Sequence, residues 1–238
     1  MTAGMPVLAR PARPPMASVH PELLLMLLAD ARLPTSGHTQ SAGLEPALLG
    51  GLHPSDLVAY CATRLATVTR TDAATAVVTR ARTLAGLDTD DIEKAWAART
   101  PSPAIRDSAR TLGRGYRRVA LRLWSGSAHL VELQGVTAPA RARVLGLVAA
   151  EVGLSAEALA RLVAYDDLQS VLAASLKLLP GDPVDATARL LSLAPEVEAM
   201  VDEVIDVAGP DDIPAWSAPL LEAWAEAHAG AERRLFRG

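Results

Sequence analysis

Apolar residues recur at helical spacing along most of the chain, and Pro, Gly and polar residues interrupt them at short intervals. The clearest repeat alternates steps of four and three and predicts one seam along a helix of about six turns: Ile105, Ala109, Leu112, Tyr116, Val119 and Leu123. Ser102 is placed to cap this helix, Pro103 fits its first position and Gly126 ends it. Such a seam predicts that other helices bury it.

The same pattern predicts helices ahead of this one. A short helix over 22–29 is apolar on nearly every side, so we expect it to be buried. A second short helix over 41–49 stops at a pair of glycines. Two consecutive helices then begin at Pro54, with a break or kink at Thr71–Asp72. Thr89 is the expected N-cap of the next helix, over 90–99.

Five further helices are predicted towards the C-terminus, over 139–152, 155–179, 184–193, 196–207 and 218–229. Gly153 is the expected left-handed residue between the first two, and Ser155 the cap of the second. The second is apolar around most of its circumference and is expected to be central. The stretch "PGDP" at 180–183 predicts a turn.

Together these elements predict an all-α, single-domain bundle of about nine or ten helices over residues 20–229. Residues 1–19 contain four prolines and little apolar content, which predicts a flexible Pro-rich arm. Residues 230–238 form a basic C-terminal tail that contains "ERRLFRG". Few aromatic residues (3%) beside 50% hydrophobic residues agree with closely packed helices.

Charge and cysteine content narrow the functional classes. A net charge of −4 gives no overall attraction to nucleic acid or anionic membranes, and a single Cys61 excludes an internal disulfide. No apolar run approaches the roughly 18 residues of a membrane span, and the cytoplasm is the expected compartment. A rival interpretation is a signal peptide, because Arg10 and Arg13 precede the apolar run and 29–31 has a small-x-small form.

The polar segment "ADARLPTSGHTQSAGLEPAL", residues 29–48, is the first candidate site. Ser36, His38 and Ser41 suggest nucleophilic catalysis. A nucleophile elbow needs G-x-S-x-G after a strand, however, and here the sequence is T-S-G-H-T with no strand before it. We expect these groups to satisfy one another and the ends of two helices instead.

Metal and nucleotide sites have weaker signals. The five histidines are scattered, with no i, i+4 pair on one helix face. Asp166–Asp167 and Asp211–Asp212 are adjacent pairs that we expect to be solvated rather than chelating. A phosphate-binding G-x-x-x-x-G-K-[ST] is absent from the sequence.

A basic stripe follows the long helix at spacings of three and four: Arg110, Arg114, Arg117, Arg118 and Arg122. A solvated face is one interpretation of this stripe. The other is a surface for an acidic partner, with a protein favoured over nucleic acid because the net charge is negative.

The stretch "LLLMLLADARLPTSGHTQSAGLE" resembles the N-terminal signature of the urease accessory protein UreF family. In that signature a Leu-rich helix leads through a Leu-Pro step to a Gly-aromatic-Ser-x-Ser-x-Gly-Leu-Glu loop. Six positions match it: Pro34, Gly37, Ser41, Gly43, Leu44 and Glu45. His38 stands where an aromatic residue is usual, and Thr39 where Ser is usual.

The resemblance extends over about residues 20–200. "IRDSARTLGRGYRRVAL" resembles the family's long helix, with Arg106 and Gly113 at its recurring Arg and Gly positions. Lys177, Leu178 and Pro180 resemble the basic residue and Leu-x-Pro turn that end the family's last matched helix. The chain departs at 180–183, because family members continue with Leu-Gly-Gln.

The resemblance implies an all-α, dimerising, non-catalytic maturation protein. Such a protein bridges the scaffold UreD (also called UreH) and the GTPase UreG, and the complex delivers nickel to apo-urease. It implies no cofactor bound by the chain itself, since the complex handles nickel and GTP. We expect Arg106, Arg110, Lys177 and Pro180 on the partner-facing surface, with Glu45 available to a helix start or a partner. The alternatives are a divergent protein-binding module, an enzyme around His38 or His129, and a nucleic-acid binder through the arginine stripe.

Overall fold

A computed structural model describes residues 19–232 and 235–236. With residues 57–84 counted as one rod, these residues contain ten helices, nine of them of seven residues or more, and no strand. The predicted all-α, single-domain fold of about nine or ten helices is confirmed. The predicted Pro-rich arm lies outside the described residues, except for Val19.

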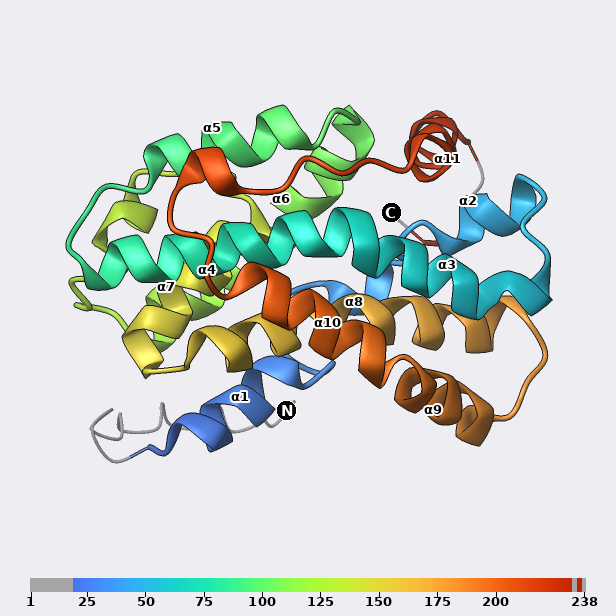
Figure 1. Cartoon of the computed structure of the whole chain (residues 1–238), viewed down its shortest axis with the longest axis horizontal. Helices are drawn as coiled ribbons and strands as arrows, with labels where there is room; N and C mark the ends of the chain where they lie inside the picture. The colour runs from blue at the N-terminus through green and yellow to red at the C-terminus, as the bar shows by residue number, and fades with distance from the viewer. Residues whose placement is uncertain (1–18, 233–234, 237–238) are drawn as a thin grey trace, which may run out of the picture.

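A long central rod organises the fold (Figure 1). It consists of α3 (Leu57–Arg64), a π-helical turn (Leu65–Thr69) and α4 (Arg70–Leu84). α7 (Arg141–Val152) and α8 (Ala156–Leu178) both pack against α4. Every residue of α7 except Glu151 is buried. The centre of the core therefore lies where these three helices meet.

Seven further helices surround this centre: α1 (Pro21–Ala29), α2 (Leu44–Leu49), α5 (Asp90–Arg99), α6 (Pro103–Leu123), α9 (Pro183–Ser192), α10 (Ala194–Val204) and α11 (Pro219–Ala229). α1 packs on α8, α6 packs on α7, and α11 packs on α2 and α6 (Figure 1). Short 3₁₀ turns join some of them at Gly37–Thr39, Pro54–Asp56, Val131–Gln134 and Pro210–Asp212. Apart from the rod, the predicted helices are shifted by at most three residues at either end.

α4 and α7 approach closely because their contact residues are small. A Cβ atom at Gly146 would lie 2.5 Å from both the Ala76 carbonyl oxygen and the Thr79 Cβ, so only glycine fits there. The hydroxyls of Thr75 and Thr79 donate to the carbonyls four residues earlier, each at 2.7 Å. These bonds let polar threonines be buried in the contact.

The predicted break at Thr71–Asp72 is wrong. Both residues lie inside α4, and the irregularity is the π-helical turn just before it. The Thr71 hydroxyl donates to carbonyls of Thr67 and Pro214, and the Asp72 carboxylate accepts from the Trp96 indole N–H. Because these side chains have partners elsewhere, they do not compete with the helix backbone.

Thr89 precedes α5 as predicted, but its side chain does not cap the helix. Its hydroxyl donates to Glu132 and accepts from Arg143. The carboxylate of Asp88 takes the capping role, since it accepts from the Asp90 N–H at 2.6 Å. Tertiary contacts to Arg143, which is itself buried, have therefore replaced the local cap.

The prediction that the first helix is buried all round is wrong. Leu24 and Leu28 of α1 are buried, whereas Leu23 is 61% and Met26 68% exposed. α1 lies at the edge of the bundle and packs one face on α8 (Figure 1). Its outer face therefore remains apolar and uncovered within the described chain.

α6 begins as predicted, with the Ser102 hydroxyl accepting from the Ile105 N–H and Pro103 in the first turn. Burial of its seam is confirmed only in the middle, at Tyr116 and Val119. The N-terminal part of the seam is half-buried, and Leu123 is 43% exposed. Among the described residues, none of the helices combines the length and apolar character needed to cross a bilayer.

Candidate functional site

The polar segment 29–48 forms a tightly turned loop that leads into α2. Ser36 and Ala42 have positive φ angles of 73° and 49°, and Gly43 follows at 77°. Ser36 and Ala42 are the two non-glycine residues with positive φ within the described residues. Left-handed backbone costs free energy at such residues, so neighbouring groups must hold the loop in place.

Three contacts from other helices hold this loop. The Tyr60 hydroxyl donates to the Ala42 carbonyl at 2.8 Å. Arg118 of α6 donates to the Pro34 carbonyl at 2.8 Å, and the Ser108 hydroxyl donates to the Gln40 side chain at 2.9 Å. The loop is therefore bound to both α3 and α6.

Glu45 connects this loop to the C-terminal tail. Its two carboxylate oxygens accept from the backbone N–H groups of Leu235 and Phe236, at 2.7 and 2.8 Å. His228 of α11 lies 3.8 Å from the same carboxylate, and Phe236 is buried. The Lys177 ammonium lies 5.1 Å from the centre of the Phe236 ring. The tail thus brings together two motif residues that are distant in sequence.

The other residues of the opening motif lie within the loop or at the start of α2. Leu44 is fully buried, and the Ser41 hydroxyl accepts from the Glu45 N–H at 3.4 Å. Gly37 lies in the 3₁₀ turn, as does His38, whose side chain lies outside what is described. Pro34 is exposed at the entry to the loop. The motif residues therefore help to determine the conformation of the loop.

Two family-motif residues of α6, Arg106 and Gly113, contact the chain segments next to this helix. Arg106 donates to the carbonyls of Thr100 and Pro101, at 2.6 and 2.7 Å. A Cβ atom at Gly113 would collide with the Pro139 carbonyl oxygen, so this glycine lets α6 approach the chain before α7.

Arg110 lies 3.8 Å from a Glu93 carboxylate oxygen and over the Trp96 ring. The arginines of the predicted stripe contact different parts of the chain. Arg117 donates to the Leu133 and Gln134 carbonyls, whereas Arg118 donates to the opening loop. Arg117 and Arg118 thus each bind a loop, while Arg114, Arg118 and Arg122 are exposed.

Pro180 is exposed, and residues 179–182 form a short non-helical connection between α8 and α9, where the sequence predicted a turn at 180–183. Asp182 caps α9 by accepting from the Val184 N–H at 2.8 Å, and Pro183 occupies the first turn. The residues that depart from the family pattern therefore serve as a helix start in this chain.

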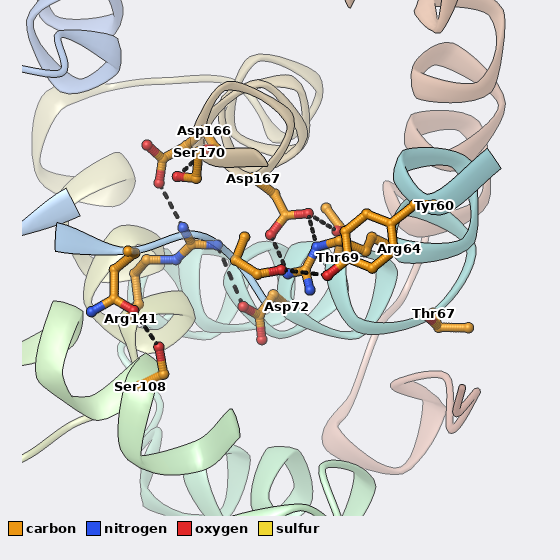
Figure 2. Close-up of polar contacts among 12 residues, drawn as sticks. Tyr60, Arg64, Thr67, Thr69, Asp72, Ser108, Arg141, Asp166, Asp167 and Ser170 are labelled. Atoms are coloured by element: carbon orange, nitrogen blue, oxygen red, sulfur yellow. Dashed lines mark hydrogen bonds and ion pairs between the residues drawn. The ribbon is translucent and has the colours of Figure 1, made fainter. Parts of the chain in front are cut away.

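The most heavily buried polar cluster was not predicted from the sequence (Figure 2). Arg64 donates to Asp167 through Nε and Nη2, at 2.9 and 2.6 Å, and the Thr69 hydroxyl donates to the same carboxylate. Burial opposes ionisation of Asp167, but the Arg64 guanidinium holds the pKa of that carboxyl below its usual range.

Arg141 forms the second half of this charge network. It donates to Asp166 at 2.6 Å and lies 3.5 Å from Asp72 (Figure 2). Burial raises the pKa of Asp72 and of Asp166. The expectation that Asp166–Asp167 is solvated is wrong, because α8 turns both carboxylates towards arginines of other helices. Asp211 and Asp212 are exposed, as expected.

A cavity of about 790 Å³ lies next to this charge network. Its walls come from the opening loop, α6, α11 and the C-terminal tail, and include Gly43, Ile105, Leu112 and Phe236. Arg64, Asp72, Arg141 and Asp167 form its charged side. The cavity thus adjoins both the opening motif and the buried network.

The remaining chemical candidates are dispersed. His129 lies on the loop after α6, where its Nδ1 is 3.2 Å from a Glu151 carboxylate oxygen that also accepts from Ser127. Within the described residues, no group of three or more His, Cys, Asp or Glu side chains is arranged to hold a metal ion.

Comparison with known proteins gives one consistent result. The model of the UreF family matches residues 52–194, which begin just after the opening segment. The chain is 37% identical over 216 residues to the urease accessory protein UreF of Mycobacterium sp. (strain JLS), covering 89% of this chain and 96% of that protein. It is 34% identical to the UreF of Mycobacterium marinum and 35% identical to that of Mycobacterium bovis (strain BCG / Pasteur 1173P2), each over 90% of this chain and 97% of the relative.

Proposed function

The chain belongs to the UreF family of urease accessory proteins, and from this we propose that it is a non-catalytic adaptor in urease maturation. In this proposal it joins the scaffold UreD (UreH) to the GTPase UreG in the cytoplasm. The assembled complex delivers nickel to apo-urease with GTP, and the chain itself binds neither. The observation that carries the proposal is similarity to urease accessory proteins along 89–90% of the chain.

The end of α8 is the part of the proposed partner surface with the most accessible charge. Lys177 and Pro180 are exposed, and the Lys177 ammonium lies near the ring of Phe236, whose backbone N–H donates to Glu45. Arg106 and Arg110 also belong to the proposed surface, although both make contacts within the chain. A partner that contacts Lys177 would meet the tail and the opening loop at the same time.

A second copy of the chain is the proposed occupant of the outer face of α1. Leu23, Met26 and Leu27 expose 61%, 68% and 39% of their surface there. Apolar side chains gathered on one exposed helix face are typical of an interface, because burying them removes their contact with water. The adaptor would then be a homodimer.

Co-expression with UreD and UreG of the same host tests the adaptor role. The expected result is a stable co-eluting complex in size-exclusion chromatography with light scattering, measured with and without GTP and nickel. Absence of any complex under all four conditions would contradict the proposal.

The two lysines of the chain provide a matched pair of variants for this test. Lys177→Glu is expected to weaken complex formation, whereas Lys94→Glu, a charge reversal at another exposed position, on α5, is expected to leave it unchanged. Equal effects of the two variants would remove Lys177 from the partner surface.

A further inference from the structure

The cavity beside the charge network has two walls of opposite chemistry. One wall is the N-terminal part of the α6 seam, where Ile105, Ala109 and Leu112 are only half-buried. The other wall contains Asp72 and Arg141, which are buried. Exposed Asp107 and Arg114 line its rim, so the cavity opens to solvent. An occupant that matches both walls must be apolar along one side and charged or polar at one end.

Asp72 determines the sign of that charge. Arg64 pairs with Asp167 and Arg141 pairs closely with Asp166, both at 2.6 Å. Asp72 is left with a 3.5 Å contact to Arg141 (Figure 2). Its other partner is the Trp96 indole N–H, at 2.8 Å.

Within the described part of the chain, this network therefore has two guanidinium groups for three carboxylates. The Asp72 side chain is only 11% exposed, and an ionised carboxylate buried without its own cation is unfavourable. Burial accordingly raises the pKa of Asp72. A cation beside Asp72 would complete the network.

We propose that this cavity binds an amphipathic cation, with its aliphatic stem along Ile105, Ala109 and Leu112 and its ammonium or guanidinium group at Asp72. At about 790 Å³, the cavity has the volume of a small-molecule site. The cation is either a free alkylamine or polyamine, or a Lys or Arg side chain of another protein. This assignment does not depend on the adaptor role.

Trp96 reports on this site, because its indole N–H is bonded to Asp72. The full chain, labelled with ¹⁵N, is titrated with n-hexylamine at pH 7, and the four Trp indole resonances are followed by NMR. We expect a saturable shift of the Trp96 resonance and none for Trp216, which is 61% exposed at the surface. The neutral analogue 1-hexanol is expected to bind at least about tenfold more weakly, because it lacks the charge. An unmoved Trp96 resonance, or equal binding of hexanol, would overturn the proposal.

Two variants locate the site. Ala109→Phe fills the cavity without changing the charge network, and it is expected to abolish the hexylamine response. Leu123→Phe adds an aromatic ring to the exposed end of the same helix, outside the cavity, and is expected to respond like the wild type. If Ala109→Phe, with wild-type circular dichroism, still binds hexylamine with wild-type affinity, the cavity is not the site.

Competition then separates the two sources of the cation. Spermidine that displaces hexylamine more effectively than the peptide Ac-Ala-Lys-Ala-NH₂ supports a free amine as the ligand. The reverse order supports a basic side chain of a protein. Failure of both probes to displace hexylamine would overturn the assignment of a natural ligand of this class.

Discussion

At the scale of single residues, Asp167 joins two buried polar groups of other elements, Arg64 and Thr69. It accepts from Arg64 of α3 and from Thr69 at the end of the π-helical turn. Thr69 is the last residue of the π-helical turn, and Asp167 lies 98 residues further along the chain. Buried ion pairs of this kind add little net stability when complete, but losing one partner leaves the other charge buried alone.

Asp167→Asn is therefore expected to lower the free energy of unfolding by about 3–5 kcal/mol at pH 7, measured by urea denaturation. Asp211→Asn, an exposed control, is expected to change it by less than about 0.5 kcal/mol. If both variants unfold at the wild-type midpoint, the charge network does not hold α3 to α8.

The stability of this pair should also depend on pH in a defined direction. The pKa of Asp167 is lower in the folded chain than the ordinary 3.8, so the unfolded chain binds the proton more readily. The ionised Asp167 contributes its full stabilisation above about pH 3.8, and this stabilisation is lost as the pH falls through the lower pKa of the folded chain. The deficit of Asp167→Asn should therefore shrink below about pH 4, as urea denaturation from pH 3 to 7 can measure. A deficit that is constant with pH would contradict this account.

At the scale of helices, the ends could be predicted and the buried polar contacts could not. Ser102, Gly153 and Ser155 act on their nearest neighbours in sequence, so their capping roles follow from local pattern. Arg64 and Asp167 are 103 residues apart, and nothing local distinguishes them from solvated charges. The one usable signal was the presence of charges inside segments that are otherwise apolar, as in α7 and α8.

In the opening loop, too, the long-range contacts could not be predicted from the sequence. Gly43 and Pro34 mark the loop in the sequence, whereas the left-handed Ser36 and Ala42 carry no local signal. The backbone N–H groups that Glu45 binds belong to the other end of the chain, 190 residues away. The residues could therefore be selected from the sequence, but not the contact between loop and tail.

The approach of α6 to the chain before α7 gives a direct test of the helix packing. Gly113→Ala is expected to destabilise the fold by about 1–3 kcal/mol, because the new Cβ atom meets the Pro139 carbonyl. Gly135→Ala, whose Cβ would meet nothing within 4 Å, is the matched control and should unfold near the wild-type midpoint. A stabilised Gly113→Ala variant would show that helix propensity outweighs the contact.

At the scale of the molecule, the apolar outer face of α1 makes the oligomeric state testable. Leu23→Asp combined with Met26→Asp is expected to convert the proposed homodimer into a monomer, because each carboxylate would be buried at the interface. Light scattering at matched concentrations measures the mass. Leu87→Asp, at another exposed apolar position, should leave the mass unchanged. A wild-type chain that is already monomeric at high concentration would contradict the dimer.

The described chain combines a buried helical core with a composite surface formed by the opening loop, the tail and the end of α8. The core places Glu45, Lys177 and Phe236 together, although the three come from separate parts of the chain. In the proposed adaptor role, a partner would contact several segments of this surface at once.

Nickel delivery to urease is the function proposed for this chain. It is tested by the nickel content and activity of urease purified from the host after deletion of the gene for this chain. If the chain acts in this step, the deletion strain makes urease protein at a normal level but with little nickel and little activity, both restored by the wild-type gene. Urease that is fully nickel-loaded and active in the deletion strain would contradict it.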